Sequence, residues 1–303
     1  MQAIKTSRIH EIPLNDQSNI KLFIKREDEL HPFISGNKFR KLKYNLIEAK
    51  RLKKNTILSF GGAYSNHIAA VAYASKNNGF KSIGIIRGEE LGNKIESNPT
   101  LQFAKSCDME FHFVTRASYR DKTKQWFIDE LENRHGDFYL VPEGGTNQLA
   151  IKGCEEILIP SDNNYDYICT CVGTGGTISG LINASDVRQK ILGFTALKGD
   201  FLKEDIRKFA QQKNWELITE YHFGGYGKIK PELITFINRI KADFDIPLDP
   251  IYTGKMMYGI FDLIEKGYFP EEAKILVIHT GGLQGIAGMN LRLKQKKLPL
   301  IKE

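Results

Sequence analysis

The sequence has few cysteines and no long apolar run. Its 303 residues include four cysteines: Cys107, Cys154, Cys169 and Cys171. That number is too small for a fold held together by disulfides. The longest apolar runs, such as 275–278, have the length of a strand and not of a membrane span. Residues 1–8 lack the apolar stretch of a secretory signal. We therefore expect a cytoplasmic protein that has no membrane partner.

The chain also lacks the features of metal-binding and nucleic-acid-binding proteins. Cys169 and Cys171 are predicted to share one face of a buried strand, and no further ligands follow at zinc spacing, so we interpret them as structural. The formal net charge is +7, with basic residues gathered at 38–54 and 292–297. Neither a pattern of basic residues interleaved with exposed aromatics nor a nucleic-acid motif is visible, so we interpret these segments as solvated helix faces. We expect no nucleic acid partner, and the charge suits anionic substrates.

Short apolar runs alternate with longer amphipathic stretches along the whole chain. The runs predict strands at 56–60, 82–88, 110–114, 138–141, 165–172, 190–194 and 274–278. Helices are predicted at 38–54 and 66–74, and Ser35 or Asn37 is the expected cap of the first. Near-continuous apolar strands alternating with helices predict an α/β fold with mostly parallel sheets flanked by helices. The length favours two lobes over one core.

A glycine-rich turn at 173–180 follows one predicted buried strand and opens a helix. Unpaired N–H groups at a helix start attract an anion, and glycines let it approach closely. Thr174 and Thr177 add hydroxyl donors. The Gly-Lys-Ser/Thr end of a Walker loop is absent, and Ile178 replaces the third glycine of a dinucleotide fingerprint. The turn therefore favours a mononucleotide or a phosphorylated cofactor.

Three more polar clusters follow predicted strands, at 61–67, 142–147 and 279–282. Because ligand sites of open α/β sheets lie at the carboxyl ends of strands, the clusters predict one cleft lined by several loops. His67 and His279 belong to these clusters, and we interpret each of them as a packing residue.

At this point the sequence resembles the D-cysteine desulfhydrase and 1-aminocyclopropane-1-carboxylate (ACC) deaminase family. The resemblance rests on five blocks, at 35–42, 61–67, 173–177, 249–255 and 279–282, which keep the family's order over nearly the whole chain. It implies the tryptophan synthase β-like fold, fold type II of the pyridoxal phosphate enzymes. The implied domains are 1–40 plus 152–303, which is the large domain that binds the cofactor, and 41–151, which is the small one.

The resemblance also implies roles for individual residues. Lys38 would be the Schiff-base lysine, and Asn66 would bond the cofactor's phenolic oxygen. The phosphate cup would be formed by Gly173, Thr174, Gly175, Gly176 and Thr177. Ser65 and Tyr252 would act on the substrate, and Thr280 would lie near the pyridine nitrogen, where a neutral hydroxyl favours elimination over transamination. The predicted helix start and neighbouring cations favour a neutral Lys38 amine, as its role requires.

Within the family, ACC deaminases carry Glu after the active-site Tyr and Leu before the glycine pair, where this chain has Thr253 and Thr280. The resemblance therefore implies α,β-elimination of D-cysteine to pyruvate, sulfide and ammonia. Tyr64 stands where the family usually has Gln, so D-serine, another β-substituted D-amino acid or ACC stay open as substrates. A non-catalytic protein that carries the cofactor is the alternative from another class. A homodimer is expected by analogy.

Overall fold

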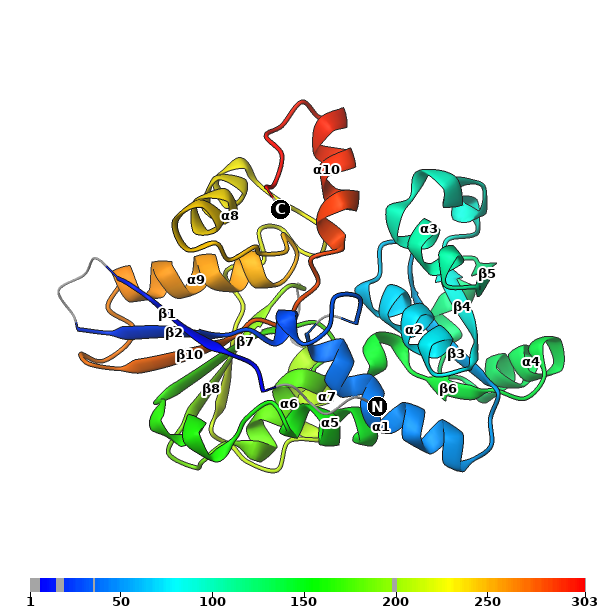
Figure 1. Cartoon of the computed structure of the whole chain (residues 1–303), viewed down its shortest axis with the longest axis horizontal. Coiled ribbons are helices and arrows are strands. Elements are labelled where there is room, and N and C mark those ends of the chain that lie inside the picture. Colours follow the sequence, from blue (N-terminus) through cyan, green and yellow to red (C-terminus); the bar gives the residue numbers. More distant parts are fainter. Residues whose placement is uncertain (1–5, 15–18, 35, 198–200, 303) are drawn as a thin grey trace.

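The computed structural model describes residues 6–14, 19–34, 36–197 and 201–302. Two sheets lie at opposite ends of the molecule's long axis, and helix α1 runs from one toward the other (Figure 1). This is the α/β architecture that the alternating pattern predicts.

The larger sheet has six strands. Their spatial order is β1 (Ile9–Ile12), β2 (Lys21–Lys25), β10 (Lys274–Ile278), β7 (Tyr167–Val172), β8 (Lys190–Thr195) and β9 (Trp215–Ile218). All neighbouring strands are parallel except β1 and β2. In β10, Ile275 and Val277 face one apolar cluster while Leu276 and Ile278 face another. The sheet is therefore covered on both faces, which explains why its strands are apolar throughout.

The smaller sheet has four parallel strands. Their order is β5 (Met109–Val114), β4 (Lys81–Arg87), β3 (Thr56–Gly62) and β6 (Tyr139–Val141). Two apolar clusters cover its faces, one with Ile57 and the other with Leu58. Every strand predicted from the sequence is present, with ends that differ by one or two residues.

Helices fill the connections between the strands. They are α1 (Asn37–Arg51), α2 (Asn66–Asn77), α3 (Pro99–Ser106), α4 (Gln125–His135), α5 (Gln148–Glu155), α6 (Gly176–Ala184), α7 (Phe201–Arg207), α8 (Pro231–Phe244), α9 (Thr253–Glu265) and α10 (Gly285–Gln295). Short 3-10 helices lie at Glu27–Glu29, Glu89–Ser97, Ser118–Asp121, Glu143–Gly145 and Pro160–Asn164. Within the described ranges, none of the helices combines the length and apolarity needed to cross a membrane.

The sequence pattern missed β1, β2 and β9. These strands have four or five residues, and polar residues interrupt each of them. In β2 the charged Lys25 is almost fully buried, 1% exposed, because it forms an ion pair with Asp162. A lysine neutralised by a partner 137 positions away has no signature in the local pattern.

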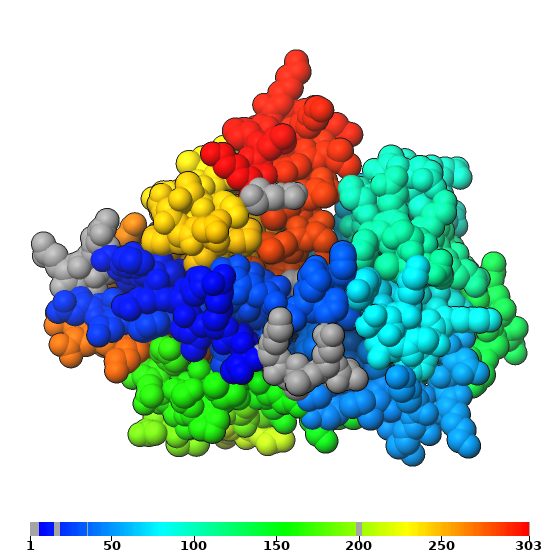
Figure 2. Space-filling model, in the orientation of Figure 1, coloured from blue at the N-terminus to red at the C-terminus, as the bar shows by residue number. Residues whose placement is uncertain are grey.

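The two sheets are joined through α1 and α5, which pack against each other. Arg40 of α1 is buried and forms an ion pair with Glu27 at 2.8 Å, and that contact fixes the beginning of α1 to the large sheet's side. On the face shown in Figure 2, α10 (red) lies against the part that contains α3 (teal). The domain boundaries at 40/41 and 151/152 cut through α1 and α5 and stay a prediction.

Candidate active site

A cavity of about 790 Å³ lies between the two sheets, at the carboxyl ends of β3, β7 and β10. It is lined by every residue that the sequence assigns to catalysis or cofactor binding: Lys38, Ser65, Asn66, Gly173, Thr174, Gly175, Gly176, Thr177, Tyr252 and Thr280. The loops that carry them meet because parallel strands end on the same edge of a sheet. A second hollow, of about 650 Å³ beside α7 and β9, contains none of them.

Lys38 lies in the first turn of α1 and lines the cavity. Its Nζ donates a hydrogen bond to Oδ1 of Asn37 at 3.1 Å. Desolvation by the surrounding protein lowers the pKa of Lys38. The predicted direction is confirmed, but burial and not the helix start is the main cause. A lowered pKa makes the neutral amine more abundant, and this is the form that attacks a carbonyl carbon.

The backbone at the start of α1 docks directly on the loop after β10. Gly36 has φ +58°, and a Cβ there would lie 1.9 Å from the carbonyl oxygen of Thr280. The N–H of Asn37 donates to that same oxygen at 3.2 Å. Asn37 does not cap α1, contrary to one of our two expectations, because it is the first residue of the helix and its Oδ1 accepts from Nζ of Lys38. Its Nδ2 donates to Oγ1 of Thr177 at 2.8 Å. The other expected cap, Ser35, lies outside the described residues.

The glycine turn between β7 and α6 is shaped as predicted for an anion site. Gly175 has φ +82° and precedes a helix start that no side chain caps. The first N–H groups of α6 are therefore available to an anion. A Cβ at Gly176 would lie 2.8 Å from Oγ1 of Thr146, and one at Gly173 would lie 3.2 Å from the Tyr252 ring. Glycine is needed at these positions to keep the turn open.

Lys41 is a basic residue beside this turn, and the sequence analysis assigned it no role in the site. Its Nζ donates to the carbonyl oxygen of Gly144 at 2.9 Å and to Oγ1 of Thr146 at 3.1 Å. Burial, reinforced by the charge of Lys38, lowers the pKa of Lys41 to about 7. A signal existed in the sequence, because residues three apart on a helix share a face, and Lys41 follows Lys38 by three.

Asn66 and Ser65 stand at the beginning of α2. Ser65 is the N-cap, and its Oγ accepts from the N–H groups of His67 and Ile68 at 3.2 and 3.3 Å. Oδ1 of Asn66 is buried and has no hydrogen-bond partner among the described residues. Buried amide oxygens are rarely left unpaired in native proteins. An unpaired amide facing a cavity is therefore a position where a polar ligand fits.

Thr280 follows β10 and is 5% exposed. Its Oγ1 lies 2.9 Å from Sγ of Cys171, and burial raises the pKa of that thiol to about 12, so the pair is neutral. The nearby Asp249 is fully buried, and its oxygens accept hydrogen bonds from the N–H groups of Ile251 and Thr253, at 2.9 and 2.7 Å. Thr280 therefore presents a neutral hydroxyl. Cys171, interpreted as structural, also lines the cavity.

Tyr252 lies immediately before α9, and burial raises the pKa of its phenol well above 10. A second tyrosine that sequence reasoning missed, Tyr226, packs edge-on against it with ring centroids 6.2 Å apart. Both line the cavity. Tyr226 stands in a loop without secondary structure, so no periodicity could have pointed to it.

The loop that carries Tyr226 is held by a buried lysine. Nζ of Lys255, on α9, donates to the carbonyl oxygens of His222 and Gly225 at 2.9 and 3.0 Å. Phe223, Gly224 and Gly225 all have positive φ, so the loop turns sharply around this amine. Burial lowers the pKa of Lys255 to about 8. The beginning of α9 thus positions both tyrosines.

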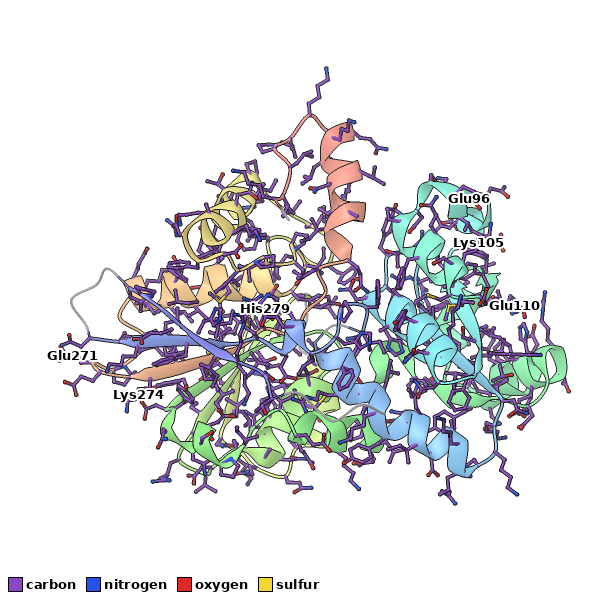
Figure 3. The ribbon with its side chains drawn as sticks, in the orientation of Figure 1. Glu96, Lys105, Glu110, Glu271, Lys274 and His279 are labelled. Atoms are coloured by element: carbon purple, nitrogen blue, oxygen red, sulfur yellow. The ribbon has the colours of Figure 1, made fainter. Side chains whose placement is uncertain are left out.

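The two cluster histidines differ. His279, in the middle of the molecule (Figure 3), is fully buried: its Nε2 lies 2.7 Å from the carbonyl oxygen of Pro247, and its Nδ1 accepts from the N–H of Gly281. It is a packing residue, as we interpret it from the sequence. Nε2 of His67 lies 2.8 Å from Oγ of Ser59, while its Nδ1 is buried without a partner among the described residues. Only Nε2 of the His67 ring therefore has a hydrogen-bond partner among the described residues.

Residues 2–281 match the family described as "Pyridoxal-phosphate dependent enzyme". A Pyrococcus furiosus protein, named provisionally as a 1-aminocyclopropane-1-carboxylate deaminase, is 30% identical over 87% of this chain and 85% of its own length. The Arabidopsis thaliana "Bifunctional D-cysteine desulfhydrase/1-aminocyclopropane-1-carboxylate deaminase, mitochondrial" is 30% identical over 88% of this chain and 73% of its own.

Solved structures agree with the sequence matches. A crystal structure described as that of an ACC deaminase homologue superimposes with a TM-score of 0.82 and 28% identity. The superposition covers 96% of this chain and 94% of the chain of that protein. The arrangement of both sheets is therefore shared with that protein.

Proposed function

Since the chain belongs to the family of pyridoxal-phosphate dependent enzymes, we propose that it catalyses α,β-elimination of a small β-substituted D-amino acid, with D-cysteine as the first candidate. One observation carries the proposal. A lysine with a lowered pKa, a helix start without a side-chain cap and a tyrosine with a raised pKa line a single cavity, although they are up to 214 positions apart (252 − 38).

The residues present fit the cofactor. The open start of α6 and the amine of Lys41 would hold its phosphate. The unpaired amide of Asn66 and the neutral hydroxyl of Thr280 would meet its ring. Pyridoxal phosphate, when bound, supplies a sink for the electrons released when a bond at the α-carbon of an amino acid breaks.

The chain's own groups would handle the protons. Lys38, neutral more readily than an ordinary lysine, would accept a proton at Nζ. Tyr252 keeps its phenolic proton because of its raised pKa, so its O–H would donate to the departing group. Ser65 Oγ accepts two backbone N–H bonds, which leaves its own hydroxyl proton free for the substrate's carboxylate.

The proposed reaction is balanced by one water. The bond between the α-carbon and its hydrogen and the bond between the β-carbon and sulfur both break. Hydrolysis of the three-carbon product then gives pyruvate and ammonia, and the sulfur leaves as sulfide. No oxidant or reductant is consumed.

ACC deamination is the second candidate, favoured by the names of the relatives. Thr253 and Thr280 support D-cysteine over ACC in this chain. Thr253 is fully buried and donates its hydroxyl to Asp249 at 2.9 Å, so it offers no carboxylate to the cavity where ACC deaminases carry Glu. The carrier alternative finds no support, because the named relatives are enzymes.

The test is an assay of the purified protein supplied with pyridoxal phosphate. We expect a visible absorbance band, and pyruvate with sulfide from D-cysteine but not from L-cysteine. Pyruvate formed from ACC and none from D-cysteine would replace the first candidate by the second. A homodimer stays a proposal by analogy, and sedimentation at several concentrations would test it.

A further inference from the structure

We propose that Arg87 forms a subsite for a second negatively charged group on the substrate, so that the preferred substrates carry an oxyanion such as phosphate or sulfate on the β-carbon. The inference rests on the proposed function and names its substrate class. Arg87 is the last residue of β4 and lines the cavity.

The charges around the cavity single out Arg87. The lining of the cavity includes five basic residues: Lys38, Lys41, Arg87, Arg116 and Lys122. Arg116 forms an ion pair with Glu90 at 2.6 Å, and Lys122 forms one with Glu143 at 3.3 Å. Lys38 and Lys41 belong to the proposed cofactor site. Of the other three basic residues, Arg87 is the one that forms no ion pair with a carboxylate among the described residues.

The guanidinium of Arg87 has a defined place. It lies over the ring of Tyr119 with its central carbon 5.6 Å from the ring centroid. That ring is 2% exposed, and its hydroxyl donates to Glu143 at 2.8 Å, so the platform is fixed. Stacking occupies the face of a guanidinium and leaves its N–H groups free at the edge.

The space in front of Arg87 is open toward the cavity. Gly62 is paired with Arg87 in the sheet register, and a Cβ at Gly62 would lie 3.6 Å from Nη2. The missing side chain leaves the guanidinium accessible from the cavity. Tyr64 does not fill the space either, because its ring packs on Gly288 of α10, where a Cβ would lie 2.7 Å from Cδ1.

The chemistry of a guanidinium selects the ligand. Its parallel N–H groups match the two oxygens of a carboxylate, phosphate or sulfate, and such charge-assisted pairs are stronger than neutral hydrogen bonds. Under the proposed function, the α-carboxylate is bound by the hydroxyl proton of Ser65, which its two backbone hydrogen bonds leave free. Arg87 is therefore free for a group on the side chain.

The experiment compares O-phospho-D-serine with D-cysteine on the holoenzyme and on Arg87→Met and Arg87→Lys. Elimination of O-phospho-D-serine with one water yields pyruvate, ammonia and inorganic phosphate. We expect kcat/KM for O-phospho-D-serine to exceed that for D-cysteine. Their ratio should fall about 10- to 100-fold in Arg87→Met, as the loss of a charge-assisted pair requires. The ratio for Arg87→Lys should lie between the ratios for wild type and for Arg87→Met.

Arg116→Met is the matched control, because Arg116 lines the same cavity but is paired with Glu90. The ratio should stay within about twofold in this variant. A ratio unchanged in Arg87→Met, or wild-type enzyme that prefers D-cysteine, overturns the inference and leaves the proposed function standing. If neither compound is turned over, the proposed function fails. Calorimetric binding of O-phospho-D-serine to wild type and Arg87→Met then still decides the subsite.

Discussion

The two ends of the cavity are built differently. The end that we propose for the cofactor, here called the cofactor end, includes the backbone of a glycine turn and buried hydroxyl side chains: Thr177 and Thr280 are 4% and 5% exposed. The end that we propose for the substrate, here called the substrate end, includes large side chains from separate loops, and Tyr64 and Tyr226 are 53% and 48% exposed. Backbone geometry requires particular residues at fixed spacing, whereas side chains that reach across an open space do not. From this difference in burial we infer that the cofactor end is the more rigid part and the substrate end the more adaptable one.

The largest effect should come from the point where the two ends meet. Lys38→Ala removes the amine that both ends share, and turnover should drop by on the order of 10³-fold or more. The visible absorbance band of the protein should disappear with it. Lys50→Ala, on the same helix, is the control and should keep both. A Lys38→Ala protein that stays coloured and active would refute the assignment of this lysine.

Rigidity of the cofactor end can be tested at Gly36. Gly36→Ala brings a Cβ onto the Thr280 carbonyl oxygen and requires φ +58°, so the free energy of unfolding should fall by about 3 kcal/mol. Gly79→Ala is the matched control, because Gly79 also has positive φ, +77°, but faces open space. It should cost about 1 kcal/mol. Equal losses in urea denaturation would mean that the close contact at Gly36 is unimportant.

The pH dependence of cofactor affinity should reveal Lys41. Its pKa of about 7 is lowered by burial, so above pH 7 the amine must take up a proton to meet a phosphate dianion. Affinity should therefore weaken up to about tenfold per pH unit above pH 7. Calorimetry in buffers of different ionisation enthalpy would measure the proton uptake. In Lys41→Met, the proton uptake that accompanies cofactor binding above pH 7 should vanish. If proton uptake persists in this variant, another group must be its source.

The smallest effect is expected at the substrate end. Lys255→Met removes the amine that holds the loop of Tyr226, so KM for the amino acid should rise about 3- to 10-fold. Cofactor affinity should change little, because the loop does not form the phosphate site. Lys255→Arg should recover part of the loss. A parallel loss of cofactor affinity and substrate affinity would break the distinction between the two ends.

Much of the fold could be read from the sequence because its strands are buried on both faces. β3, β7 and β10 are nearly continuous apolar runs, and each of them ends in or leads into a segment rich in glycine. β2 escaped because its buried Lys25 needs a distant partner to be tolerated. Asn37 was expected to cap α1, but its side chain contacts Lys38 and Thr177 instead, and a local pattern cannot foresee the contact with Thr177.

The sequence alone predicts the proposed cofactor end, from Lys38 in the first turn of an amphipathic helix and a glycine turn after a buried strand. These features are local, since they depend on backbone conformation and on short-range spacing. At the proposed substrate end, Ser65 and Tyr252 were predicted from the family resemblance. The packed chain is needed to bring Arg87 and Tyr226 to the same cavity and to place Lys255 against the loop of Tyr226. The physical reason is that burial and pairing are properties of the packed chain. Burial lowers the pKa of Lys41 to about 7, and the packing leaves Arg87 without an ion-pair partner among the described residues. Neither outcome can be predicted from the residue type alone.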